Sequence, residues 1–224
     1  EIAERCGCHP TAMQRLLNAL VGARCLKFRR GKYELPKRAR AWFLKEGKYS
    51  FHDQILLHYL EWEWWTHCEE YLRSGEPLNV HDSMTTEQWG VYQKGMRAGI
   101  DLPAQWIARA LPLRAGADSM LDIGGGHGHF SVALCRRYPK LCATILELPE
   151  AIPHAAPLLA KEGLGDRIVY RAGDARAENL GESEYDLVFL SAVTHHFDAE
   201  TNRALMKRIA RALRPGGVVA IWEA

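Results

Sequence analysis

Short apolar runs alternate with amphipathic segments from residue 113 to the end of the chain. An apolar run of five or six residues is typical of a buried strand, and a 3.6-residue period is typical of a helix. We predict strands at 119–123, 142–147, 167–171, 186–191 and 218–223. We predict the intervening helices near 129–138, 152–162 and 200–213. This alternation favours an α/β fold with a parallel sheet, in which ligands bind at the carboxyl ends of the strands.

The first 35 residues follow a different pattern. They predict a short helix at 2–6, a second helix at 11–21 and a hairpin at 26–35 that turns at Arg30-Gly31. One face of the second helix is apolar and consists of Met13, Leu16, Leu17 and Leu20. Helix, helix and hairpin in this order predict a winged-helix module.

The segment from Trp42 to Trp106 is helical in pattern and rich in tryptophan, at positions 42, 62, 64, 65, 89 and 106. Core packing is our first interpretation of each of these side chains, although aromatic residues also serve interfaces and substrate pockets. A break is predicted at 75–77. The helix predicted at 85–99 carries Trp89 and Met96 at helical spacing, and we take these two, with His52, as candidate substrate-binding residues.

Charge is unevenly distributed along the 224 residues, whose net charge is +2. Residues 1–48 contain 12 Lys or Arg and 4 Asp or Glu, which gives them +8 and leaves −6 for the rest. We therefore expect a basic winged-helix module at 1–48, a helical linker and substrate lid at 49–112 and a Rossmann-like domain at 113–224.

A basic hairpin tip at Arg29, Arg30 and Lys32 would suit a wing that grips phosphates. The second helix supports this less clearly, because Arg15 is its only cation. The charge is equally explained by a solvated face of a module that packs against a second copy. We expect no nucleic-acid partner, and a DNA-binding regulator with a ligand-sensing domain is the alternative.

No stretch approaches the roughly 18 consecutive apolar residues of a membrane helix, so we expect a cytoplasmic protein with no membrane partner. The six cysteines include no C-x-x-C pair. Cys6, Cys8, His9 and Cys25 match no common zinc spacing, so we predict reduced thiols and no metal site.

The strongest local signal is the glycine-rich segment 121–130, which ends the first predicted strand and opens a helix. Glycines allow a ligand to approach the backbone closely, and a helix N-terminus presents N–H groups to an anion. The dinucleotide fingerprint would need a small residue where His129 stands. Asp122 followed by Gly124, Gly126 and Gly128 instead suits a ligand with an amino-acid end and no pyrophosphate.

Three further acids accompany the other strands. Glu147 ends the second strand, where its carboxylate could accept hydrogen bonds from two ribose hydroxyls. Asp174 follows the third strand in the run Gly173-Asp174-Ala175 and could accept a hydrogen bond from an adenine amino group. Asp186 begins the fourth strand. Together at strand ends of one sheet, these acids predict a nucleoside site.

With these motifs in place, the chain resembles the small-molecule O-methyltransferases that carry a winged-helix dimerisation domain, such as caffeate, acetylserotonin and polyketide O-methyltransferases. The resemblance covers nearly the whole chain and is most specific at 122–128, at 147–149 and at Gly173-Asp174. It implies a class I methyltransferase fold, S-adenosylmethionine as cofactor, a small aromatic hydroxyl compound as acceptor and a homodimer. It also implies donor contacts from the strand-end residues above and from Leu148.

The resemblance further implies two catalytic residues. The run 193–197 matches the family's base motif, which gives the role of general base to His195, and a glutamate beside the base falls on Glu223. A phenol with a pKa near 10 and an imidazole with a pKa near 6.5 differ by about 5 kcal/mol in proton affinity, so deprotonation should accompany methyl transfer. We expect His196 to be structural, Asp198 to cap the following helix, and His127 and His129 to be loop and helix-start residues.

The chain also departs from the family pattern. The family usually has aspartate where Glu147 stands, and some members have a lysine where Ser191, still a candidate donor contact, stands here. The family has two further strands and a helix after the fifth strand, so we expect the Rossmann-like sheet to be incomplete and the chain to be clipped at both ends. Methylation of carbon or nitrogen is the alternative reaction.

Overall fold

The computed structural model describes residues 1–47, 49–76 and 78–223. The chain divides into two compact units, Glu1–Asp53 and Gln54–Ala224. Three of the predicted features touch residues outside the described ones: the module boundary at Lys48, the helix break at Pro77 and the chain end at Ala224. The division into 1–48, 49–112 and 113–224 stays a prediction.

The first unit has the element order that its sequence predicts. It contains α1 (Ile2–Arg5), α2 (Pro10–Gly22), the antiparallel strands β1 (Lys27–Arg29) and β2 (Lys32–Glu34), and α3 (Lys37–Phe43). The hairpin turns at Arg30 and Gly31, whose φ angles of 49° and 74° suit a two-residue turn that matches the twist of the strands. Leu16 is 53% exposed, so the apolar face of α2 is narrower than predicted. The winged-helix assignment stays a prediction.

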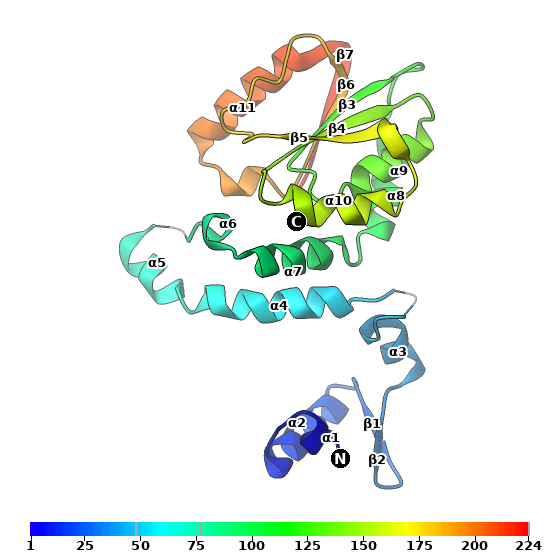
Figure 1. Ribbon diagram of the computed structural model, residues 1–224, viewed down its shortest axis with the longest axis vertical. Helices are drawn as coiled ribbons and strands as arrows, with labels where there is room; N and C mark the ends of the chain where they lie inside the picture. Colours follow the sequence, from blue (N-terminus) through cyan, green and yellow to red (C-terminus); the bar gives the residue numbers. More distant parts are fainter. Residues whose placement is uncertain (48, 77, 224) are drawn as a thin grey trace. The chain divides into compact units, whose positions relative to one another are not determined.

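The second unit contains a five-stranded parallel sheet, in the order β5-β4-β3-β6-β7 (Figure 1). The strands are β3 (Ser119–Ile123), β4 (Cys142–Glu147), β5 (Ile168–Ala172), β6 (Tyr185–Ser191) and β7 (Leu213–Trp222). The bounds of β3 and β4 coincide with the prediction. β7 begins five residues early because Leu213 already pairs with Tyr185, before an irregularity at the Pro-Gly-Gly run.

Helices cover both faces of this sheet. On one face, α8 (Asp101–Ala110) and α9 (His129–Arg137) form a buried cluster with Met120 and Phe189 of the strands. On the other face, α11 (Ala199–Ala212) packs its apolar side against Leu121 and Val188. Neighbouring strand residues point to opposite faces, which is why both faces of β3 and β6 are apolar. Helix α10 (Ile152–Ala160) follows β4. The unit also contains two short 3-10 turns, η1 (Gly165–Arg167) and η2 (Thr194–His196).

The helical segment before the sheet contains α4 (His52–Trp65), α5 (Cys68–Ser74), α6 (Val80–Ser83) and α7 (Thr86–Arg97). Helix α7 begins with a capping box, in which Thr85 and Gln88 exchange hydrogen bonds between side chain and backbone. Gly75 follows the last residue of α5 and caps the helix in the left-handed conformation. Among the described residues, no helix has the length and hydropathy needed to cross a bilayer.

The core assignment of the tryptophans is correct for Trp89, which is 4% exposed, and wrong for three others. Trp62, Trp65 and Trp106 are 71%, 68% and 62% exposed. Helical spacing places these residues on helices but does not show which side of a helix meets the core.

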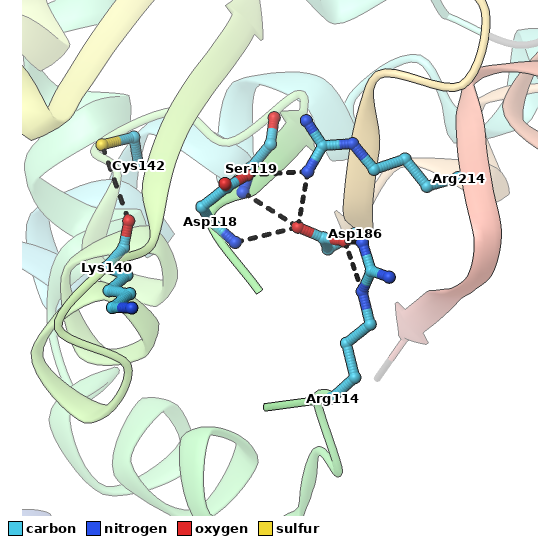
Figure 2. Close-up of polar contacts among 7 residues, drawn as sticks. All are labelled: Arg114, Asp118, Ser119, Lys140, Cys142, Asp186 and Arg214. Carbon is cyan, nitrogen blue, oxygen red and sulfur yellow. Dashed lines mark hydrogen bonds and ion pairs between the residues drawn. The ribbon is translucent and has the colours of Figure 1, made fainter. Parts of the chain in front are cut away.

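Asp186 lies at the amino-terminal edge of the sheet, the opposite edge from the other strand-end acids, so its inclusion in a nucleoside site was wrong. Figure 2 shows its carboxylate among Arg114, Arg214 and the backbone of Asp118 and Ser119. The carboxylate accepts hydrogen bonds from Arg114 Nε at 2.8 Å, from Arg214 Nη1 at 2.9 Å and from the Asp118 N–H at 2.8 Å. Its side chain is 1% exposed, and the residue fastens the start of β6 to the chain before β3.

Candidate active site

The carboxyl ends of the five parallel strands meet at one edge of the sheet, and a cavity of about 630 Å³ opens there within the second unit. Four of its walls come from residues that follow β3, β4, β5 and β6. Helices α6 and α7 supply another wall. Most of the predicted site residues line this cavity, namely Gly124, Gly126, Glu147, Leu148, Gly173, Asp174, Ala175, Ser191, His195, Trp89 and Met96.

The glycine loop after β3 has no room for side chains. A Cβ at Gly124 would lie 2.6 Å from Val193 Cγ2, and a Cβ at Gly125 would lie 2.5 Å from the carboxyl carbon of Asp122. Gly124 also has a φ of 65°, a conformation that favours glycine. The Tyr170 hydroxyl donates a 2.7 Å hydrogen bond to the Gly126 carbonyl and fixes the loop from β5. The backbone is therefore held at the cavity wall, where a ligand can approach it closely.

Two predicted residues support the loop without lining the cavity. Asp122 is 1% exposed beneath Gly125, and its Oδ2 accepts a 2.6 Å hydrogen bond from the Ser131 hydroxyl. Its Oδ1 is one of the buried polar atoms without a hydrogen-bond partner among the described residues. Burial raises the pKa of Asp122 to about 7, against the lowering effect of the Ser131 hydrogen bond. Gly128, with a φ of 73°, precedes α9 and faces Ile145.

Glu147 is 9% exposed at the end of β4. Its two carboxylate oxygens accept hydrogen bonds from the Gly126 N–H at 2.7 Å and from the Leu148 N–H at 2.8 Å. Burial raises the pKa of this carboxyl, and the two backbone hydrogen bonds oppose the rise. A carboxylate oxygen has a second lone pair, so both oxygens can still accept hydrogen bonds from ribose hydroxyls at the cavity wall.

Asp174 forms an ion pair within the loop that follows β5. Both of its oxygens accept hydrogen bonds from Arg176 Nε, at 3.1 and 2.8 Å, and Arg176 Nη2 lies 2.6 Å from Oδ2. The Arg176 side chain holds the pKa of Asp174 below its usual value. Arg208 of α11 donates hydrogen bonds to the carbonyls of Ala175 and Glu178, which fixes the loop against the sheet.

His195 and Glu223 form a hydrogen-bonded pair. His195 Nδ1 lies 2.7 Å from Glu223 Oε2, and the other carboxylate oxygen accepts from the Thr194 N–H at 2.8 Å and the Thr194 hydroxyl at 2.7 Å. Burial alone would raise the pKa of Glu223, but the hydrogen bonds from His195 and Thr194 lower it to about 2. Because the carboxylate is ionised, Nδ1 of His195 is the protonated nitrogen and Nε2 is available as a base.

Four further aromatic rings extend from His195 along the cavity, and we call His81, Trp89, Tyr92, His195 and His196 the aromatic wall. The ring centroids of His195 and His196 are 4.1 Å apart, and those of His196 and His81 are 4.9 Å apart. His81 stacks on Trp89 at 5.5 Å and meets the edge of Tyr92 at 5.4 Å. His196, which we expected to be structural, thus belongs to the cavity lining.

Gln93 is a cavity residue that the sequence interpretation did not select. It is 3% exposed on α7, and its Oε1 has no hydrogen-bond partner among the described residues. A Cβ at Gly126 would lie 3.1 Å from this oxygen. Helical spacing already groups Gln93 with Trp89 and Met96 on the predicted helix, but only those two were selected as candidate site residues. No comparable sequence signal marks His81.

The remaining expectations near the site have mixed outcomes. Asp198 caps α11, as predicted, and accepts a 2.7 Å hydrogen bond from the Thr201 N–H. His127 lies in the glycine loop and His129 begins α9, also as predicted. His52 belongs to the first unit, so its role in substrate binding stays a prediction.

Residues 75–224 match the family model of the O-methyltransferase domain. The chain belongs to this family. It is 33% identical over 132 residues to the 3-hydroxy-5-methyl-1-naphthoate 3-O-methyltransferase of Streptomyces sahachiroi, a stretch that covers 59% of this chain and 38% of that protein. It is 33% identical over 152 residues to the L-tyrosine C(3)-methyltransferase of Streptomyces lavendulae, covering 67% of this chain and 40% of that protein.

Among solved structures, human N-acetylserotonin methyltransferase in complex with SAM has the same fold, with a TM-score of 0.79 at 19% identity. That match covers 98% of this chain and 67% of the human chain. The matched part of this chain thus spans about two fifths of the two curated relatives' length.

Proposed function

We propose that the protein is an S-adenosylmethionine-dependent O-methyltransferase that methylates a hydroxyl group of a small aromatic molecule. The observation that carries this proposal is the His195–Glu223 pair, 2.7 Å apart, at a cavity that also contains a glycine loop and two strand-end carboxylates. Membership of the O-methyltransferase domain family supports it.

The residues around the cavity fit the methyl donor. Glu147 would accept hydrogen bonds from the ribose hydroxyls, and Asp174 with the backbone beside Ala175 would hold the adenine. The amino-acid end would lie against the glycine loop, where the buried Oε1 of Gln93 has no hydrogen-bond partner among the described residues. Such an oxygen suits an ammonium group, because a buried acceptor without a donor is costly. When bound, the donor supplies an electrophilic methyl group on a sulfonium sulfur.

The protein's own contribution is proton transfer and positioning. His195 Nε2 takes the proton from the acceptor hydroxyl as the oxygen becomes nucleophilic, and Glu223 stabilises the imidazolium through Nδ1. Full deprotonation of a phenol by imidazole before the transfer would cost about 5 kcal/mol, so the two events are coupled. The aromatic wall packs against the acceptor ring and helps to keep water from the site.

The test separates binding from chemistry. Calorimetric titration with S-adenosylhomocysteine measures donor-site affinity, and Glu147→Ala should weaken it at least about tenfold. Turnover with an aromatic hydroxyl acceptor then tests the base. We expect His195→Ala and Glu223→Gln each to lower kcat by about 10² to 10⁴ while the affinity for S-adenosylhomocysteine is unchanged. Unchanged kcat in the His195 variant would refute the base assignment, and no binding by the unmodified protein would refute the donor site.

Carbon methylation is the second candidate, because one of the two relatives described above is named as an L-tyrosine C(3)-methyltransferase. Its acceptor also has a phenolic hydroxyl, so a base at His195 would serve both reactions by generating a phenolate. Mass spectrometry of the product, with a fragment pattern that locates the added methyl group, distinguishes the two.

The homodimer, the cytoplasmic location and the absence of a nucleic-acid partner stay predictions. Exposed aromatic side chains on α4 support an interaction surface there, since Tyr59, Trp62 and Trp65 are each more than two thirds exposed.

A further inference from the structure

Charge is distributed unevenly around the cavity. Among the described lining residues, Arg176 is the only lysine or arginine, and four residues contribute carboxyl groups: Asp82, Glu147, Asp174 and Asp198. Arg176 is already paired with Asp174 at 2.6 Å, and the charge of Asp82 also acts on it. No cation of the described lining is therefore left to bind an anionic group of a ligand.

Three members of the aromatic wall, His81, His196 and Tyr92, add no positive charge to this lining. His81 and His196 are within 5 Å of each other between centroids, and His196 also lies against His195. Burial lowers the pKa of both rings, in His196 to about 4. For His81 the charge of Asp82 opposes this lowering, and the charge of His195 adds to it. Burial raises the pKa of Tyr92 to about 12. These side chains are uncharged at neutral pH and offer flat surfaces and neutral hydrogen-bonding nitrogens.

Resting on the proposed function, we propose that the acceptor is an aromatic hydroxyl compound that carries no negative charge, and that His81 and His196 select it. A neutral ring can stack on the wall and exchange hydrogen bonds with the imidazole nitrogens. A carboxylate on the same ring would lose its hydration in a cavity whose described lining offers it no free cation. Moving an ionised group from water into such a site without a partner is costly, so we expect a loss of affinity of about tenfold or more.

This substrate class differs from that in the name of one relative, whose naphthoate acceptor is anionic. On the proposed function, donor binding and proton transfer use Glu147, Asp174 and His195, while residues of α6, α7 and η2 line the rest of the cavity. Here those residues are His81 and Asp82 of α6, Trp89 of α7 and His196 of η2.

The test uses two naphthols that differ in one group, 6-hydroxy-2-naphthamide and 6-hydroxy-2-naphthoate. Binding to the protein saturated with S-adenosylhomocysteine is measured by calorimetry at neutral pH, so no turnover is needed. We expect the amide to bind at least about tenfold more tightly than the acid. Equal or tighter binding of the acid overturns the proposal, and so does a failure of the amide to bind at about 1 mM.

A charge-introducing variant provides the converse test. His81→Lys should raise the affinity for the acid about tenfold and remove most of the preference, because it adds a cation beside the aromatic wall. The matched control is His67→Lys, at an exposed position directly before α5, which should leave the preference for the amide unchanged. Asp82→Asn, at an exposed position, removes a negative charge without adding a cation, so it should reduce the ratio of the affinity for the amide to the affinity for the acid. If neither cavity variant changes the ratio of the two affinities, the selection does not arise from these residues.

The two proposals fail in different ways. If S-adenosylhomocysteine does not bind, the proposed function is wrong. If it binds, and the acid then binds as well as the amide, only the inference about the acceptor is wrong.

Discussion

Asp122→Asn tests whether a buried carboxyl beneath the glycine loop costs stability. The Asp122 side chain has a single hydrogen-bond partner among the described residues, the Ser131 hydroxyl at 2.6 Å, and it is 1% exposed. Burial raises its pKa from 3.8 to about 7, and the negative charge of Glu147 adds to the rise. The variant keeps an oxygen for Ser131 and cannot ionise.

The sign of the effect follows from proton binding. Between the unfolded pKa of 3.8 and the folded pKa of about 7, the folded protein holds a proton that the unfolded chain releases. The unfolding free energy of the unmodified protein therefore falls as pH rises through this window. A shift of about 3 pKa units corresponds to about 4 kcal/mol, of which about 3 kcal/mol lies above pH 5. The Asp122→Asn variant does not lose unfolding free energy in this way, so its stability relative to the unmodified protein increases with pH.

Urea unfolding at about pH 5 and about pH 8 measures the change. We expect the unfolding free energy of the variant minus that of the unmodified protein to increase by about 2 to 3 kcal/mol between the two conditions. Titrations of other groups cancel in this difference. Asp166→Asn, at an exposed position of η1, is the matched control and should show no such increase. A pH-independent difference for Asp122→Asn would refute the assignment of a raised pKa to this buried carboxyl.

Two other substitutions test whether residues at the two opposite edges of the sheet have different roles, one in ligand binding and the other in stability. Gly126→Ala places a methyl group 3.1 Å from Gln93 Oε1 at a φ of 49°, so it should cost about 1–2 kcal/mol of backbone strain and weaken S-adenosylhomocysteine binding about tenfold by calorimetry. Asp186→Ala removes a buried acceptor from Arg114, Arg214 and the Asp118 N–H, so urea unfolding should show a loss of about 3 kcal/mol. Binding should stay within about twofold, because Asp186 lies at the opposite edge; a larger loss would contradict this separation.

Much of the second unit could be predicted from local pattern. The bounds of β3 and β4, the cap at Asp198 and the glycine loop follow from apolar runs, a short polar residue before a helix and closely spaced glycines. These features depend on neighbours in sequence, since strand burial and helix capping are satisfied within a few residues. The parallel arrangement followed from the alternation of strands and helices, which also explains why Glu147 and Asp174 reach one cavity.

Reasoning from the sequence failed where the outcome depends on which end of a strand a residue occupies, or on which side of a helix faces the core. Asp186 stands at the beginning of its strand, and in a parallel sheet the strand beginnings lie at the edge opposite the ligand site. The position of Asp186 in the sequence already indicated this, but we grouped it with the other acids by residue type alone. The exposure of Trp62, Trp65 and Trp106 depends on which helix face meets another element. Amphipathic spacing alone does not identify the partner of that face.

The sequence by itself determined the strands, the crossovers and the chemistry available at the strand ends, because these depend on periodicity and on residue type. Tertiary structure alone decided that His81 of α6 meets His196 of η2 and that Gln93 faces the glycine loop. These two contacts join residues separated by 115 and 33 positions in the sequence. Such contacts arise only when the sheet and its covering helices bring distant side chains together, and no local pattern encodes them.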